Sequence, residues 1–193
     1  MILLIDNYDS FTYNLAHLLG ESREVMVMRN DDKQLVDLAK EASSIVISPG
    51  PGTPAETGQV KQVIQDFHQE KPMLGICLGN QTIGEVFGAR VVLAEEIRHG
   101  KQSMIQTAPN SRLFKGMPSE LPVMRYHSLV IDPSTLPQEF DISATALDDQ
   151  EIMAIEHRNY PVFGLQFHPE SIGTPAGKEM IQNFIQLMEE QKI

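Results

Sequence analysis

The first half of the chain alternates short apolar runs with longer segments in which apolar residues recur at helical spacing. Each apolar run predicts a strand, and the runs are ILLID at 2–6, EVMVMR at 24–29, SIVIS at 44–48 and PMLGI at 72–76. Between them the spacing predicts helices near 10–20, 31–42 and 58–70, the first with Asp9 or Ser10 as its N-cap. Strands and helices that alternate in this way indicate a parallel sheet with helices on both faces.

After residue 88 the pattern changes to short β-like pieces separated by turns. The pieces are ARVVLAE, SMIQT, PVMRYHSLVI, DISATAL, EIMAIEH and VFGLQF. They predict an antiparallel extension of the same domain, followed by an amphipathic helix over 176–191. The chain shows no internal repeat and no linker, so we expect one domain over residues 1–193. The predicted fold class is α/β, with a mostly parallel central sheet, helices on both faces and a β-rich antiparallel extension.

Composition narrows the class of protein further. The 26 acidic residues exceed the 15 basic ones, and a net charge of -11 would repel nucleic acid and anionic membrane surfaces. No window approaches the roughly 20 apolar residues of a membrane span. The N-terminal apolar run meets Asp6 at once, which predicts a strand rather than a signal segment. A single cysteine cannot form an internal disulfide, so we expect a cytoplasmic protein.

That single cysteine, Cys77, lies between Gly75 and Gly79 at the end of a predicted strand. A nucleophile on a sharp strand-to-helix turn needs small residues two positions away, because larger side chains would collide with the sheet. The helix expected to begin near Asn80 would direct free N–H groups at the sulfur and favour the thiolate. The alternative is a small, inert, buried cysteine.

His168 and Glu170 follow the last predicted strand and are separated only by Pro169. Residues two apart leave the same face of an extended chain, so the carboxylate can hold one ring nitrogen while the other meets the thiol. The alternative is a histidine in a solvated turn. The other five histidines lie in helix patterns or lack an acid at a useful spacing: His17, His68, His99, His127 and His157.

The segment SPGPGT at 48–53 also follows a predicted strand. Glycine there lets the main chain approach a substrate, so its N–H groups and that of Leu78 can form an oxyanion hole. An ordinary Pro/Gly loop is the alternative. Because the loops at 49–58 and 77–80 both leave the carboxyl ends of predicted parallel strands, we expect them to lie at one crevice.

These segments together closely resemble class I (triad-type) glutamine amidotransferases. The motifs that carry the resemblance are LIDNYDSFTYNL, SPGPGTP, GICLGNQTIG, RHGKQS, RYHSLVI and FHPES, which cover nearly the whole chain. Within the family, the sequence is similar to the glutaminase subunits of anthranilate synthase and aminodeoxychorismate synthase. The resemblance implies a flavodoxin-like α/β core and hydrolysis of glutamine to glutamate and ammonia.

The resemblance also implies roles for individual residues. Cys77 would attack the glutamine amide, His168 would act as base and then as acid, and Glu170 would orient His168. Gly50 and Leu78 would supply the oxyanion N–H groups. The glutamine pocket would be lined by Gly50, Pro51, Gly52 and Gln81, with the main chain of Ser128 and Leu129 holding the α-amino and α-carboxylate groups.

One position departs from the family motif, which is C-L-G-H-Q where this chain has CLGNQ. The family histidine at this position is not a member of the triad, so Asn80 leaves the chemistry intact. Asn80 can still form hydrogen bonds and can cap the start of the helix. This departure puts in question how the glutaminase site is coupled locally to a partner.

A partner is expected because free ammonia would mostly be protonated at pH 7 and lose its nucleophilicity. The resemblance implies a separate chorismate-using synthase large subunit, in a heterodimer or heterotetramer that serves tryptophan or folate biosynthesis or both. No cofactor is expected in this chain, and the Mg2+ of such complexes would belong to the synthase. Two alternatives stay open: a redox-responsive or peptidase-like enzyme with the same cysteine turn, and a noncatalytic flavodoxin-like binding module.

Overall fold

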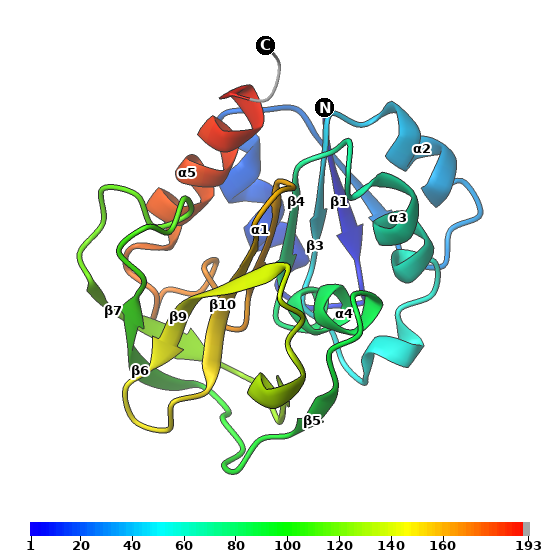
Figure 1. The fold of residues 1–193 in the computed structure, drawn as a ribbon. Helices are drawn as coiled ribbons and strands as arrows, with labels where there is room; N and C mark the ends of the chain where they lie inside the picture. Colours follow the sequence, from blue (N-terminus) through cyan, green and yellow to red (C-terminus); the bar gives the residue numbers. More distant parts are fainter. Residues whose placement is uncertain (191–193) are drawn as a thin grey trace.

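The apolar runs of the first half form the parallel part of one large sheet (Figure 1). The computed structural model describes residues 1–190. Five strands run parallel in the order β2-β1-β3-β4-β11. They are β1 (Ile2–Asp6), β2 (Val25–Arg29), β3 (Ser44–Ile47), β4 (Met73–Ile76) and β11 (Val162–Leu165). The first four strands match the predicted apolar runs to within one residue at either end.

Helices cover both faces of this sheet, as the alternating pattern predicts (Figure 1). One face is covered by α1 (Thr12–Gly20) and α5 (Gly177–Glu190). The other face is covered by α2 (Leu35–Glu41), α3 (Val60–Phe67) and α4 (Leu78–Val86). Among residues 1–190, none of the helices combines the length and the apolar composition needed to cross a membrane.

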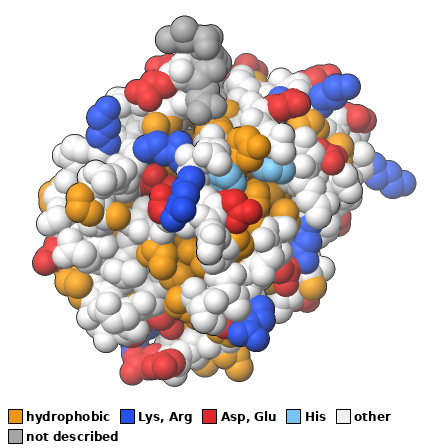
Figure 2. All heavy atoms as spheres, viewed as in Figure 1, with side chains coloured by type: hydrophobic (Ala, Val, Ile, Leu, Met, Phe, Trp, Pro, Cys, Tyr) orange, Lys and Arg blue, Asp and Glu red, His pale blue; other side chains and the backbone are white. Residues whose placement is uncertain are grey.

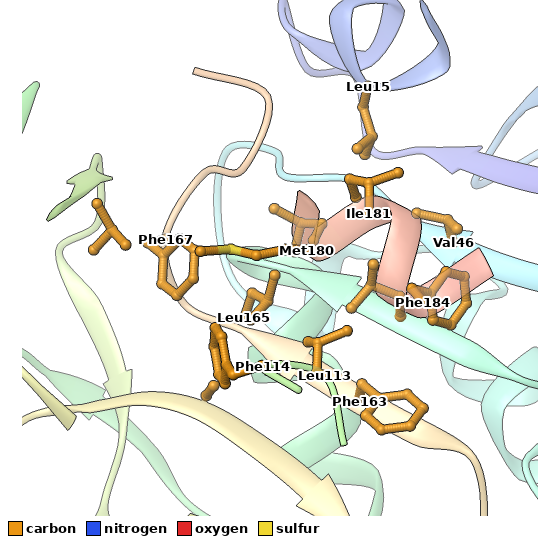
Figure 3. Packing of buried hydrophobic residues seen from close by; sticks show 14 of the residues in the cluster. Leu15, Val46, Leu113, Phe114, Phe163, Leu165, Phe167, Met180, Ile181 and Phe184 are labelled. Atoms are coloured by element: carbon orange, nitrogen blue, oxygen red, sulfur yellow. The ribbon is translucent and has the colours of Figure 1, made fainter. Parts of the chain in front are cut away.

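Strand β1 shows why helices pack on both faces of the sheet. Ile2 and Leu4 belong to the core cluster that includes α1 and α5, whereas Leu3 and Ile5 belong to the cluster that includes α2 and α3. Figure 3 shows part of the first cluster, with side chains of α5 among those of the strands. Strands buried on both faces are apolar throughout, and this is why their positions could be predicted.

The second half extends the same sheet with antiparallel strands in the order β11-β10-β9-β6-β7. Their bounds are β6 (Lys101–Thr107), β7 (Glu120–Arg125), β9 (Phe140–Ala146) and β10 (Ile152–His157), and a separate pair consists of β5 (Val91–Leu93) and β8 (Leu129–Ile131). The predicted antiparallel extension is confirmed, except that VFGLQF returns to pair in parallel with β4. Figure 2 shows acidic and basic side chains interspersed over the face seen in Figure 1.

Helices α1 and α2 begin later than predicted, and α3 begins at Val60 rather than near 58. α1 begins at Thr12 with Phe11 as its N-cap, and the carboxylate of Asp9 accepts the N–H of Phe11 at 2.7 Å in the turn before it. α2 begins at Leu35, because the Asp32 carboxylate holds the preceding turn. Asp side chains that bond the backbone two residues on stabilise turns as well as helix starts. The last residue predicted for the C-terminal helix, at position 191, lies outside the described residues.

Candidate active site

Cys77 lies on a sharp turn between β4 and α4. Its backbone has φ 51° and ψ −101°, a region that residues other than glycine rarely adopt. The helix begins directly after it at Leu78, so the predicted start near Asn80 is wrong by one or two residues. The N–H of Cys77 donates to the carbonyl of Leu165 at 2.7 Å, and its own carbonyl accepts the N–H of Gln81.

The two glycines around Cys77 are required by close backbone packing. A Cβ on Gly75 would lie 2.5 Å from the carbonyl carbon of Gly79, and a Cβ on Gly79 would lie 2.5 Å from the carbonyl oxygen of Ile47. Real Cβ atoms do not come this close to backbone. The steric reason inferred from the G-x-C-x-G spacing is therefore confirmed.

His168 and Glu170 form a buried pair on the loop after β11. Nδ1 of His168 lies 2.6 Å from Oε1 of Glu170, and both side chains are almost completely buried. Burial acts to lower the pKa of His168, but the neighbouring Cys77 and the hydrogen-bonded Glu170 raise it to about 10. Nε2 of His168 is buried and makes no hydrogen bond with any described residue. Besides Glu170, Cys77 is the neighbour that raises the pKa of His168.

Gln166 is a site residue that the sequence analysis missed. Its side chain is fully buried, and its Nε2 lies 3.6 Å from Sγ of Cys77. Its Oε1 accepts a hydrogen bond from Nε2 of Gln81 at 3.2 Å. A signal was present, because Gln166 is the one polar residue of VFGLQF and lies two positions before His168, on the same face of an extended chain.

A cavity of about 170 Å³ opens beside Cys77. Its lining includes every residue predicted for the oxyanion hole and the glutamine pocket: Gly50, Pro51, Gly52, Leu78, Gln81, Ser128 and Leu129. Tyr126 and His127 also line it and were not predicted. Gln81 of α4 links this helix to the other side of the cavity, because its Nε2 donates a hydrogen bond to the carbonyl of Leu129 at 2.9 Å. A larger hollow of about 780 Å³, beside β6 and β9, contains none of the predicted residues.

The Pro/Gly loop is fixed against the cysteine turn. A Cβ on Gly50 would lie 2.5 Å from the carbonyl oxygen of Asn7 and 3.1 Å from Cδ2 of Leu78. Asn7 holds the start of the loop, because its Nδ2 donates to the Ser48 carbonyl and its backbone N–H donates to Ser48 Oγ, both at 2.9 Å. Any side chain at Gly50 would thus displace the loop from the cavity.

Asn80 does not cap the helix, so that prediction is wrong. The N-cap is Cys77, and Asn80 is the third residue of α4. Its side chain is fully buried against Gly164 of β11, and its amide makes no hydrogen bond with any described residue. The position faces the sheet rather than the first turn of the helix.

His127 has no acid at a useful spacing in the sequence, but the fold brings a distant one near it. Oε2 of Glu151 lies 4.0 Å from Nε2 of His127, and Nε of Arg125 lies 3.0 Å from the same nitrogen. Burial and the charge of Arg125 lower the pKa of His127 to about 3. Within residues 1–190, no group of three His, Cys, Asp or Glu side chains could hold a metal ion.

The sheet order, the cysteine turn and the cavity agree with one family. The model of the glutamine amidotransferase class-I family matches residues 3–187, so the chain belongs to this family. It is 50% identical over 192 residues to anthranilate synthase component 2 of Lactococcus lactis subsp. lactis (strain IL1403), covering 100% of this chain and 97% of the relative. It is 46% identical over 195 residues to aminodeoxychorismate/anthranilate synthase component 2 of Bacillus subtilis (strain 168), covering 100% of both chains.

A solved structure supports the fold. The crystal structure of a putative GMP synthase subunit from Thermoplasma acidophilum matches with a TM-score of 0.88 and 28% identity, over 98% of this chain and 94% of that chain. The resemblance inferred from the motifs is therefore confirmed at the level of family and fold class.

Proposed function

We propose that this chain is the glutaminase subunit of a chorismate-using synthase and that Cys77, His168 and Glu170 hydrolyse L-glutamine. The observation that carries the proposal is a strained cysteine that lines a small cavity and has a buried His–Glu pair as its neighbour. The names of the relatives support the assignment, since each is component 2 of a synthase.

The chemistry follows from the positions of the side chains. A protonated His168 beside the sulfur favours the thiolate, which attacks the amide carbon of glutamine and forms a tetrahedral intermediate. The N–H groups of Gly50 and Leu78 would stabilise its oxyanion. The C–N bond then breaks as His168 gives its proton to the departing ammonia, which leaves a γ-glutamyl thioester on Cys77.

A water molecule completes the cycle. His168, now neutral, takes a proton from water as the water oxygen attacks the thioester carbon, and glutamate leaves as the thiolate re-forms beside the imidazolium. Glu170 holds Nδ1 of His168 throughout, which keeps Nε2 directed at the reacting atoms. Pro51, Gly52, Gln81 and the main chain of Ser128 and Leu129 would bind the rest of the substrate.

The partner is part of the proposal. Ammonia released into water at pH 7 is mostly protonated, so the reaction needs a synthase subunit docked near the cavity. We assign that role to a chorismate-using large subunit, in a heterodimer or heterotetramer that serves tryptophan or folate biosynthesis or both. Any Mg2+ would be bound by the synthase, and this chain would need no cofactor of its own. A cytoplasmic location belongs to the same proposal.

The test is the variant Cys77→Ser in the complex with the synthase subunit. We expect the variant to lose glutamine-dependent amination of chorismate and to retain amination from added ammonium, because serine is not activated by the same pair. Both rates are measured on one preparation, so the ammonium rate reports that the complex is intact. Equal loss of both rates, or retention of the glutamine rate, would contradict the assigned role.

A further inference from the structure

Behind the cavity wall, a fully buried arginine binds three carboxylates. Arg125, the last residue of β7, has a side chain with no exposed surface. Its Nη1 lies 3.2 Å from Asp148 Oδ1, and its Nη2 lies 2.8 Å from Asp149 Oδ2 and also contacts Glu151. The carboxylates come from the turn between β9 and β10. A buried guanidinium needs such partners, because an unpaired charge in the interior is strongly destabilising.

Arg125 also donates from Nη1 to Ser103 Oγ at 3.2 Å, and its Nε donor is used on a neutral imidazole. Nε of Arg125 lies 3.0 Å from Nε2 of His127. A guanidinium has donors and no acceptor, so the imidazole nitrogen must accept this hydrogen bond. An imidazole that accepts at Nε2 is neutral and carries its proton on Nδ1. The pKa of His127, which burial and the charge of Arg125 lower to about 3, agrees with this state.

His127 begins the segment 127–129 that walls the cavity. The carbonyl of His127 accepts the N–H of Arg98, and the carbonyl of Ser128 accepts the N–H of Ala94, both at 2.9 Å. The carbonyl of Leu129 accepts from Gln81 at 2.9 Å. The main chain of this segment is therefore held on one side by hydrogen bonds, while the ring of His127 is held by Arg125.

We propose that Arg125 is a positioning residue for glutamine binding, which acts by holding His127 as the neutral Nδ1–H tautomer and so fixes the segment 127–129. The inference rests on the proposed function, since it takes glutamine to be the ligand of this cavity. A protonated His127 could not accept from Arg125 and would place two cations in contact. The ring and its segment would then have to move.

The charged groups around His127 decide what removal of Arg125 does. Asp149 and Glu151 favour the imidazolium, whereas Arg125, Arg98 and His168 oppose it. In an Arg125→Met variant the two carboxylates would face the imidazole without the neighbouring guanidinium. The pKa of His127 should rise in that variant. The affinity of the variant for glutamine should then depend on pH.

The first test measures the unaltered chain and uses one variant only to assign the signals. Nitrogen NMR of the imidazole rings, with the His127 signals identified by their loss in His127→Gln, reports which ring nitrogen carries the proton. We expect Nδ1–H and a bare Nε2, unchanged between roughly pH 5 and pH 8. An Nε2–H tautomer, or titration of His127 within that range, would overturn the proposal even if Arg125→Met does not fold.

The second test measures the Michaelis constant for glutamine in the complex with the synthase subunit. In Arg125→Met we expect it to rise about tenfold, and more toward acid pH, as loss of one hydrogen-bonded contact implies. The control is Arg112→Met, which also removes an arginine paired with a buried carboxylate, here Glu156 of β10. Unlike Arg125, Arg112 makes no hydrogen bond with a residue that lines the cavity. An unchanged constant in Arg125→Met, or an equal rise in the control, would contradict the proposal.

These outcomes are separable from failure of the proposed function. If the unaltered complex does not use glutamine at all, the glutaminase assignment fails. If the unaltered complex uses glutamine and only the Arg125 and His127 results disagree, the glutaminase assignment stands and the positioning role is wrong.

Discussion

Cys77 shows how one residue is held in a conformation that it would not adopt alone. A non-glycine residue in a sparsely populated backbone region costs about 1–3 kcal/mol and persists when its surroundings determine it. Here the surroundings are hydrogen bonds on both sides of the residue, to Leu165 and from Gln81, and two glycines that let β4 and α4 approach. The strain places Cys77 at the cavity and beside His168.

The role of Glu170 can be tested at the same scale. In Glu170→Gln the imidazole loses a negative neighbour, so the pKa of His168 should fall from about 10 toward its ordinary value. We expect kcat/KM for glutamine to fall by about two orders of magnitude or more. The measurement is a pH–rate profile of the complex, with the exposed Glu139→Gln as control. A profile that is unchanged in both variants would argue against the pair.

Some residues of the site could be predicted from local sequence, and others could not. Cys77, His168 and Glu170 are each marked by near neighbours in the chain, through flanking glycines or a two-residue spacing. His127 has Arg125 two residues before it, but its acidic neighbour Glu151 is distant in sequence and meets it only through the fold of the antiparallel extension. The assigned roles of the triad remain predictions until variants are measured.

At the scale of elements, strands were easier to predict than helix starts. β1, β3 and β4 are buried on both faces, so their apolar runs begin and end with the strand. The starts of α1 and α2 were misplaced, because Asp9 and Asp32 bond the backbone of turns that precede the helices. A capping residue and a turn residue look alike in sequence when both are aspartate.

The contact between α4 and β3 gives a prediction for this scale. In Gly79→Ala the new Cβ would lie 2.5 Å from the Ile47 carbonyl oxygen, so we expect a loss of about 1–3 kcal/mol of unfolding free energy. Gly20→Ala is the matched control, since nothing lies within 4 Å of a Cβ there. Alanine should stabilise that helix end by up to about 1 kcal/mol. Urea denaturation measures both, and equal effects would contradict the packing argument.

At the scale of the molecule, the site lies where neighbouring parallel strands end. The Pro/Gly loop follows β3, Cys77 follows β4 and His168 lies on the segment after β11, and these three strands are adjacent in the sheet. Parallel sheets bind ligands beyond the carboxyl ends of their strands. The meeting of the first two loops could be predicted from this rule. The place of β11 could not, because it returns to β4 only after the antiparallel extension.

The two buried histidines predict how stability depends on pH. His168 has a folded pKa raised to about 10 from 6.5, so its contribution is full below pH 6.5 and is lost as pH rises through about 10. His127 has a folded pKa lowered to about 3 from 6.5, so its contribution is present above pH 6.5 and is lost as pH falls through about 3.

The two histidines thus stabilise the fold most near pH 6.5. Each limb of the profile of unfolding free energy against pH can be tested with its own variant. His127→Gln should flatten the acid limb and His168→Asn the alkaline limb, each by up to about 1.4 kcal/mol per pH unit, the value for one proton. Urea denaturation across this range measures the free energy of unfolding. Parallel curves for the variants and the unaltered chain would refute the assignment of these protons.

The central claim is that Cys77 is a nucleophile activated by His168 at a glutamine pocket, and covalent labelling tests it most directly. The complex is treated with a glutamine-like electrophile, and the adduct is located by mass spectrometry. We expect one adduct per chain, on Cys77, formed more slowly when L-glutamine is present and in His168→Asn. Labelling that ignores glutamine, or that proceeds at the same rate without the imidazole, would contradict the claim.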